Sequence, residues 1–416
     1  MADDGRVVEQ QLGRTVAQLQ AVGDAAEPLW RSIRAATTAT YAAFVVSGLA
    51  FASWASRIPQ LRDQLRLDPS TLGLVLLSVS AGCVAALPLS GPVVARFGSR
   101  RTVAASGLLF GAGLATVAVG SLAGVAPVVV GLVVLGFATG AWDVAMNLQG
   151  TALERHLRRS IMSRFHAGFS VGSVAGALIG TAMVALHVPV AAHLAAVAVV
   201  VPVVVSIAAR RFVADRDRAA RATHPRRALA AWAERRTLLI GFFVLAFTFA
   251  EGAGTDWIGV ATIDGHHAAA SLATLAFAAF LAAMTLGRWF GPGFLDRYGR
   301  VPVVRALAVT ACAGTALFVF APTAPLAFVG TLLWGVGISL GFPVGMSAAA
   351  EDPESAAGRV SVISSIGYCA FLAGPPTIGF LGTHVTVLRA LVAVAVLLAV
   401  AAVFSAVVAP RRSDRS

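Results

Sequence analysis

The feature that most constrains this chain is a succession of twelve long apolar segments that almost lack charge. A hydrocarbon core about 30 Å thick is crossed by roughly 20 residues of helix. Soluble domains carry roughly 25% charged residues, whereas this chain has 12% charged and 57% hydrophobic residues. We therefore expect an all-α membrane protein with twelve transmembrane helices, at residues 36–56, 71–94, 102–123, 127–149, 164–186, 189–209, 237–261, 271–293, 303–321, 325–348, 360–383 and 386–408.

An arginine-rich stretch at residues 210–236 divides these segments into two sets of six. Because it is too polar to lie in lipid, it is expected to be a loop between two helical units. The sequence thus predicts five parts: a cytoplasmic tail at 1–35, a six-helix bundle at 36–209, a cytoplasmic linker at 210–236, a second six-helix bundle at 237–408 and a cytoplasmic tail at 409–416.

The distribution of arginine predicts the orientation in the membrane. Cytoplasmic loops of membrane proteins carry an excess of positive charge. With the N-terminus inside, every arginine except Arg57, Arg62, Arg66 and Arg389 falls on the cytoplasmic side. The net charge of +12 then reflects topology and not a nucleic-acid partner. We expect a multi-pass protein of the bacterial inner membrane, in contact with the lipid bilayer, with both termini cytoplasmic.

Short patterns recur in the two halves at a nearly fixed offset. Arg-Phe-Gly at residues 96–98 matches Arg-Tyr-Gly at 297–299 (297 − 96 = 201), and Gly136 matches Gly337 at the same offset (337 − 136 = 201). Shared offsets of this kind are typical of transporters built from parallel repeats. The two sets of helices are therefore expected to be related by pseudo-symmetry.

The loops after the second and eighth segments carry a recognisable motif. Residues 91–101 read Gly-Pro-Val-Val-Ala-Arg-Phe-Gly-Ser-Arg-Arg, and residues 296–300 read Asp-Arg-Tyr-Gly-Arg. Both resemble the Gly-x-x-x-Asp-Arg-x-Gly-Arg-Arg signature of the major facilitator superfamily, at the two places where that family carries it. The resemblance implies two bundles around a cavity, alternating access and a cytoplasmic latch, to which we assign Arg96, Gly98, Arg100, Arg288, Asp296, Arg297, Gly299 and Arg300.

The first copy of the motif departs from the signature. Ala95 stands where the signature has Asp, and Ser99 stands where it has Arg. The second copy keeps both positions, as Asp296 and Arg300. We therefore expect the second copy to form the stronger latch.

Four further motifs, at residues 54–59, 143–150, 165–170 and 251–257, resemble the YbjJ-like bacterial branch of the superfamily, which is distantly similar to fucose permease. Drug/proton antiporter branches usually show Arg-x-x-Gln-Gly in the fourth span and a proline in a glycine run of the fifth. Here Met146 stands at the arginine position, and the fifth span lacks the proline. These departures make drug efflux the less favoured reading.

Two carboxylates lie inside predicted spans, Glu251 in the seventh and Asp143 in the fourth. An ionisable side chain at that depth costs at least roughly 2.5 kcal/mol and indicates a functional site. Each carboxylate is a candidate to bind a proton in one conformation and release it in the other, with Glu251 as the main group. The alternative is a structural ion pair, for example of Asp143 with Arg164 or His166.

The resemblance places the first, fourth, seventh and tenth spans around the cavity, and each holds one tryptophan. Flat aromatic faces suit sugars and other ring-bearing solutes, although Trp54 and Trp257 also suit an interfacial belt. Arg57 is either an outer-gate cation or a snorkelling anchor. The candidates for the substrate cavity are Trp54, Arg57, Trp142, Asn147, His166, Trp257 and Trp334.

Other functional classes find little support. Gly-x-Ser-x-Gly at residues 168–172 lies inside an apolar helix, and Gly172, Gly176 and Gly180 form a packing face there instead of a nucleophile elbow. No enzyme activity, metal or cofactor is expected. We expect a proton-coupled secondary transporter of a sugar, organic acid or drug-like solute, by uptake or export. The alternatives are a multidrug or metabolite efflux pump and a non-transporting membrane sensor or scaffold.

Overall fold

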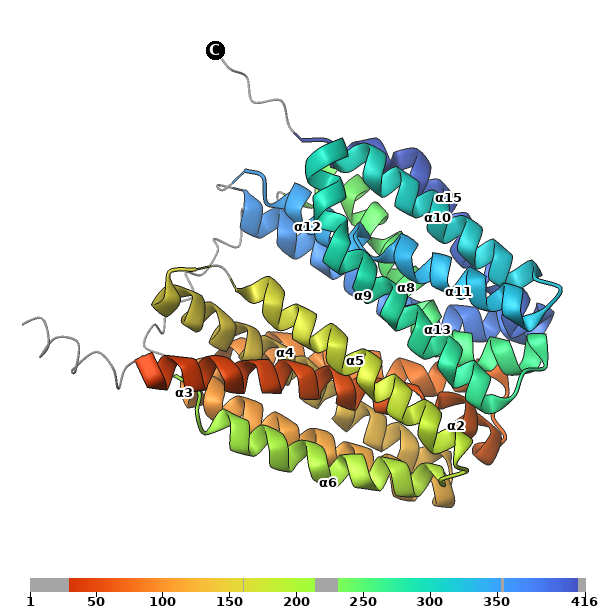
Figure 1. Ribbon diagram of the computed structural model, residues 1–416, viewed down its shortest axis with the longest axis horizontal. Helices are drawn as coiled ribbons and strands as arrows, with labels where there is room; N and C mark the ends of the chain where they lie inside the picture. The colour runs from red at the N-terminus through yellow and green to blue at the C-terminus, as the bar shows by residue number, and fades with distance from the viewer. Residues whose placement is uncertain (1–29, 160, 214–230, 353–354, 411–416) are drawn as a thin grey trace, which may run out of the picture.

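The computed structural model of the protein describes residues 30–159, 161–213, 231–352 and 355–410. Most of the expected N-terminal tail (1–29), most of the linker (214–230) and the end of the C-terminal tail (411–416) lie outside the described residues. Within the described ranges the chain is helical and has no strand, so the all-α fold is confirmed. Figure 1 shows the helices arranged side by side in two bundles.

The first bundle begins with a helix at residues 30–55, and a two-residue turn separates it from the short helix α2. Asp68 caps the following helix by accepting hydrogen bonds from the backbone N–H groups of Ser70 and Thr71. The elements of this bundle are α2 (Ile58–Leu65), α3 (Pro69–Ala123), α4 (Val125–Leu157), α5 (Met162–Ala185) and α6 (Val190–Ala209).

The second bundle starts after the linker. Two of its predicted spans are interrupted: the tenth is divided at Ser339 and Leu340, and the twelfth at Leu391. Its elements are α8 (Arg235–His266), α9 (Ala270–Tyr298), α10 (Arg300–Phe320), α11 (Ala324–Ile338), α12 (Gly341–Ala349), α13 (Ala356–Val385), α14 (Val387–Ala390), α15 (Val392–Phe404) and the 3-10 helix η1 (Ser405–Val408).

The helix α3 is 55 residues long, more than twice the length that crosses a membrane. Its backbone leaves the helical conformation at Gly98, with φ 82° and ψ 157°. Gly299, its repeat partner, has φ 81° and ψ 164° and separates α9 from α10. Glycine tolerates this positive φ without steric cost. The described chain has 11 helices long and apolar enough to cross a membrane, and dividing α3 at Gly98 gives the twelve expected spans.

Small residues let the first helix and α5 approach each other closely, as the glycine spacing predicts. A Cβ atom added at Gly172 would meet the carbonyl oxygen of Val45, and one added at Gly176 would meet that of Leu49. Gly180 faces the Ser56 side chain in the same way. Helix association inside a membrane depends on such close packing, because lipid tails are as apolar as the helix surface.

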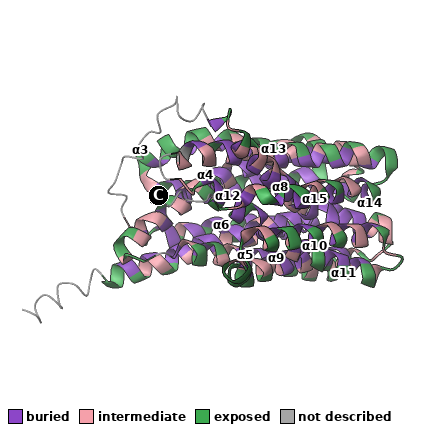
Figure 2. Cartoon of the chain, turned by 90° about the horizontal axis from the view of Figure 1, so that it is seen from above, coloured by how far each residue is buried: buried purple, intermediate pink, exposed green. Residues whose placement is uncertain are grey.

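The bundles pack against each other through α3 with α13 and through α5 with α9. We call the end where residue 30 and α8 begin the terminal end, and the opposite end the far end. At the far end, Gly73 near the start of α3 faces Pro375 of α13, and Gly379 faces Pro69. Figure 2 shows buried residues gathered between the helices and exposed residues along their outer sides. Large apolar side chains are exposed there, as lipid contact requires, including Leu122, Val203 and Val403.

Candidate functional site

Asp143 lies near the middle of the 33-residue helix α4 and has an exposed side chain. Asn147, one helical turn later, donates from Nδ2 to Asp143 Oδ1 at 3.1 Å and to the Asp143 carbonyl oxygen at 2.9 Å. In the part of the chain that the structure describes, no arginine forms an ion pair with this carboxylate, so the alternative of a structural pair with Arg164 does not occur in this conformation. Asp143 is therefore an exposed carboxylate inside a membrane-spanning helix, with no arginine partner among the described residues.

Side chains from three other helices surround Asp143. His166 of α5 has an exposed imidazole that interacts electrostatically with the carboxylate. Cys83 of α3 and Tyr368 of α13 also lie within electrostatic reach of it. The structure thus brings together Asp143, Asn147 and His166, which the sequence singled out. It adds Tyr368 from the second bundle, for which the sequence gives no signal beyond its place in a span.

Glu251 of α8 has a cationic partner. Arg288 of α9 donates from Nη2 to both carboxylate oxygens, at 3.0 Å to Oε1 and 2.9 Å to Oε2. Its Nε donates to the carbonyl oxygen of Ser339, at the end of α11, at 3.3 Å. The two side chains are 23% and 29% exposed. Arg288, which we expected in the latch, is therefore held by Glu251, and the pair ties three helices of one bundle together.

The four candidate tryptophans do not offer a face to a solute in this conformation. Trp54, Trp142, Trp257 and Trp334 are all between 0% and 2% exposed. Trp142 packs edge-on against Phe110, with ring centroids 6.1 Å apart, and Trp334 packs similarly against Phe280, at 5.6 Å. Neither Trp54 nor Trp257 lies in an exposed belt. The large apolar rings fill space between helices, which corrects their placement as cavity residues.

Arg57 is also buried, at 2% exposed, so it is not a snorkelling anchor. It lies in the turn between the first helix and α2, at the far end. Its Nη2 donates to the carbonyl oxygen of Val188 at 2.5 Å. Through this contact Arg57 is held at the loop before α6, and it is not part of the group around Asp143.

The second copy of the motif forms a charge network at the terminal end. Arg300 pairs with Glu351 through Nη1 and donates to Ser347 Oγ at 3.2 Å. Arg236 donates to Glu351 from Nη2 at 3.2 Å. Asp296 is exposed and forms no ion pair with a described residue. The carboxylate that pairs with Arg300 is therefore that of Glu351, whereas we expected Asp296.

In the first copy, a neutral hydrogen bond occupies the matching place. Ser99 is fully buried. The Gln149 amide is oriented so that its oxygen accepts from Val213 N–H and its nitrogen donates to Ser99 Oγ at 3.0 Å. Ser99 and Arg300 are equivalent by the repeat (300 − 99 = 201). The substitution thus replaces a charged contact with an uncharged one. Arg96 and Arg100 stay exposed, and Arg96 lies over the Phe97 ring at 5.5 Å, as Arg297 lies over Tyr298 at 5.3 Å.

Two polar clusters escaped the sequence analysis because their members lie far apart along the chain. Arg62 of α2 pairs with Asp264 at the end of α8, with Nη2 3.0 Å from Oδ1. At the terminal end, Arg359 of α13 donates to Glu234 at 2.6 Å and to Asp352 at 3.2 Å. Among pairs of described residues, the Arg62–Asp264 contact is the hydrogen-bonded link between the bundles.

Asp256, near the far end of α8, lines a small cavity together with Ser56 and Pro59 from the end of the first span and the start of α2, and Thr274 from α9. Its side chain is half-buried. The neighbouring helix α9 and the turn before α2 cover it.

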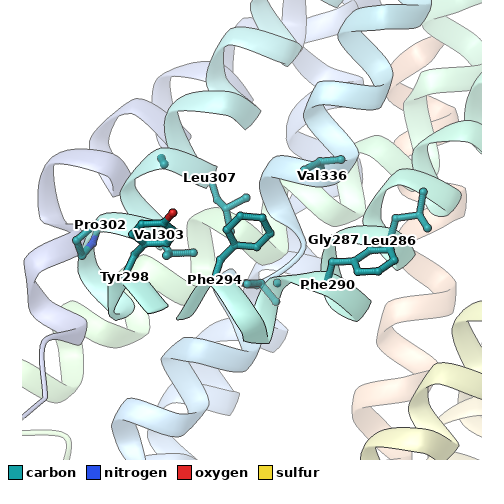
Figure 3. A pocket seen from close by; sticks show the side chains of 12 residues that line it. Leu286, Gly287, Phe290, Phe294, Tyr298, Pro302, Val303, Leu307 and Val336 are labelled. Carbon is teal, nitrogen blue, oxygen red and sulfur yellow. The ribbon is translucent and has the colours of Figure 1, made fainter. Parts of the chain in front are cut away.

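A larger hollow than the one beside Asp256 lies in the second bundle. Figure 3 shows an apolar groove of about 580 Å³ between α9, α10 and α11 near the terminal end. Its walls include the exposed rings of Phe290, Phe294 and Tyr298. Because its lining has no charged side chain and does not include Asp143, we assign it to lipid contact and not to solute binding. Among the described residues, no cluster of His, Cys, Asp or Glu could hold a metal ion.

Comparison with known proteins fits this architecture. The model of the Major Facilitator Superfamily matches residues 40–369. The chain belongs to the major facilitator superfamily. An uncharacterized MFS-type transporter of Yersinia pestis is 31% identical over 82% of this chain and 88% of its own length. As a superfamily member, the protein is a multi-pass membrane transporter and not an enzyme.

Two solved structures illustrate the shared fold. The nucleoside transporter NupG superposes with a TM-score of 0.72 at 16% identity, over 89% of this chain and 99% of NupG. The E. coli fucose:proton symporter FucP superposes with a TM-score of 0.60 at 15% identity, over 88% of this chain and 97% of FucP. Both likenesses concern the superfamily fold, of two six-helix bundles.

Proposed function

We propose that this superfamily member carries a small polar solute across the bacterial inner membrane by alternating access, with residues 36–209 and 237–408 as the two moving bundles and 210–236 as their cytoplasmic linker. The observation that carries the proposal is the exposed carboxylate of Asp143 in the middle of α4. Exposed carboxylates inside spans mark substrate pathways and proton relays. Asn147 and His166 add a donor and an imidazole beside it.

Proton coupling is assigned to Asp143 in preference to Glu251. Glu251 already accepts two hydrogen bonds from the Arg288 guanidinium, so binding a proton there requires breaking an ion pair. Asp143 has the Asn147 amide and the His166 imidazole as its neighbours, and neither is a permanent cation. A proton can therefore bind at Asp143 without separating opposite charges. The neighbouring fold of FucP, named a fucose:proton symporter, supports coupling of this type.

The conformation is proposed to be inward-facing. The arginine distribution places the terminal end in the cytoplasm. At the far end, Arg62 and Asp264 join the bundles, and Gly73 packs on Pro375. At the terminal end, the ion pairs that Arg300 and Arg359 form with described residues lie within the second bundle. The bundles are thus held together on the proposed periplasmic side, while Asp143 is open to solvent.

The proposed solute is a polar molecule that bears hydroxyl or amide groups, such as a sugar or a nucleoside. The group at Asp143 offers acceptor oxygens, an amide and an imidazole, which can exchange hydrogen bonds with such groups. NupG is named a nucleoside transporter and FucP a fucose:proton symporter, so proteins with this fold carry molecules of this class.

The experiment is a thermal-shift screen of the purified protein against sugars, nucleosides, organic acids, amino acids and drugs, followed by transport of each hit into proteoliposomes under a pH gradient. Asp143→Asn is expected to abolish accumulation driven by the pH gradient. Asp296→Asn serves as the matched control, because Asp296 is an exposed carboxylate outside the site. Unchanged pH-driven accumulation in Asp143→Asn would refute the assignment.

A further inference from the structure

The Arg57 guanidinium is enclosed by protein but only partly satisfied. The residue is 2% exposed, and Nη2 donates to the Val188 carbonyl oxygen at 2.5 Å. Its Nε and Nη1 are buried and have no hydrogen-bond partner among the described residues. The carboxylate nearest in sequence, Asp63, accepts hydrogen bonds from Arg62 and not from Arg57.

An arginine keeps its charge inside proteins, since its pKa exceeds 12. A buried charge without a counter-ion costs several kcal/mol, and a buried donor without an acceptor adds to that cost. The Val188 carbonyl is a dipole and cannot neutralise the charge. One negative charge beside Arg57 would therefore stabilise the folded protein, and the described side chains do not supply it.

The adjacent end of α6 is also prepared for an anion. The helix begins at Val190, directly after the Val188 loop, and its N-cap residue Pro189 makes no side-chain capping bond. The first N–H groups of a helix have no partner within the helix, and they form the positive end of the helix dipole. These groups and the Arg57 guanidinium meet at the same loop.

His193 completes the arrangement in the first turn of α6. Its imidazole is 4% exposed, and neither ring nitrogen has a hydrogen-bond partner among the described residues. The ring lies within electrostatic reach of the Arg57 charge. In the first turn of α6, the structure thus encloses an imidazole that has no hydrogen-bond partner in the described part of the chain.

We propose that Arg57, His193 and the N-terminus of α6 form a buried binding site for a small monovalent anion, of the size of chloride or a carboxylate group. The anion neutralises Arg57 and accepts hydrogen bonds from Nε, Nη1 and an imidazole N–H. Its source is either an inorganic halide or the carboxylate of a solute. The site is separate from Asp143, and it does not depend on proton coupling.

The test is thermal unfolding of the full-length protein in detergent, with isethionate as a bulky reference anion replaced stepwise by chloride or by formate at constant ionic strength. A bound anion stabilises the folded state in a saturable manner, with a shift of about 3 °C at saturation. A shift with chloride alone assigns an inorganic anion, and a shift with formate alone assigns a carboxylate; either result supports the site. No shift with either anion overturns the proposal.

Variants separate the site from general salt effects. Arg57→Gln is expected to lose the anion-dependent shift, whereas Arg389→Gln, which changes an exposed arginine at the same end, is expected to keep it. A shift that persists in Arg57→Gln overturns the proposal. If that variant does not fold, line broadening of ³⁵Cl in nuclear magnetic resonance, with formate as competitor, reports binding to the wild-type protein. Broadening of ³⁵Cl by the wild-type protein supports the site with chloride as its occupant, and absence of broadening together with no formate-dependent shift in the unfolding midpoint overturns it.

Discussion

Arg62 of α2 and Asp264 of α8 connect the two bundles at the far end, with Arg62 Nη2 3.0 Å from Asp264 Oδ1. Arg62 is nearly buried, with a side chain 10% exposed, whereas that of Asp264 is 43% exposed. The same guanidinium also binds Asp63 of its own helix at 2.6 Å. Arg62 thus contacts one carboxylate in the other bundle, that of Asp264, and one in its own helix, that of Asp63.

This arrangement gives the first prediction, because the two carboxylates can be removed separately. Asp264→Asn is expected to favour opening of the far end, and a partly exposed ion pair of about 1 kcal/mol corresponds to an approximately fivefold change in that equilibrium. The measurement is the thiol labelling rate of Ser56→Cys, a position buried at the far end, in a background without native cysteines. Asp63→Asn is the control, and equal labelling in both variants contradicts a role in gating.

The Glu251–Arg288 pair gives a second prediction. Glu251→Gln leaves the Arg288 guanidinium without its carboxylate and is expected to cost about 2 kcal/mol of stability, seen as a lower unfolding midpoint. Arg288→Gln in the same chain should recover part of the loss, since the unpaired charge is then gone. Accumulation driven by a pH gradient should persist in Glu251→Gln. Loss of pH-driven accumulation with an unchanged unfolding midpoint would instead assign proton binding to Glu251.

At the terminal end, Glu351 is expected to matter more than Asp296. Glu351 accepts from Arg300 and Arg236 and is 16% exposed, whereas Asp296 makes no ion pair with a described residue. Glu351→Gln should lower the unfolding midpoint by the equivalent of about 2 kcal/mol, since two charged contacts weaken. Asp296→Asn should lie within about 0.5 kcal/mol of the wild type. The reverse order would restore the assignment from the sequence.

Asp68 predicts a pH-dependent contribution to stability. The hydrogen bond from the Thr71 hydroxyl, with those from the Thr71 and Ser70 N–H groups, lowers the pKa of Asp68 below its ordinary value. The lowered pKa means that the stabilisation is present above the unfolded-state pKa of about 3.9 and is lost as pH falls through the folded-state pKa. Asp68→Ala should cost about 1 kcal/mol at neutral pH. The difference from wild type in unfolding midpoint should shrink below about pH 4; a constant difference contradicts the assignment.

The orientation can be tested independently of transport. A phosphatase reporter that is active only in the periplasm is fused after Arg412, and it should be inactive if the terminal end is cytoplasmic. The same reporter placed after His267, in the loop that follows α8 at the far end, should be active. Activity at the first position and not the second inverts the proposed topology.

The hydropathy pattern and the internal repeat predict the architecture without reference to any tertiary contact. The span expected at residues 237–261 lies within α8, and that expected at 271–293 lies within α9. The repeat also singled out Gly98 and Gly299, which adopt nearly the same positive φ. These features are local: twenty apolar residues must span lipid as a helix, whatever their neighbours are, and glycine adopts the positive φ at these two turns without steric cost.

The tertiary structure alone decided which polar groups meet. Glu251 and Arg288 are 37 residues apart, and Arg57 and Val188 are 131 apart. The hydropathy of a span does not specify how far its helix is rotated about its axis. The packing of the helices determines that Arg300 pairs with Glu351 and not with Asp296, and that the tryptophans are buried. The sequence therefore determined how many helices cross the membrane and where they begin, while the packing of helix against helix determined which of their few charges are paired, which are exposed and which are enclosed without a partner.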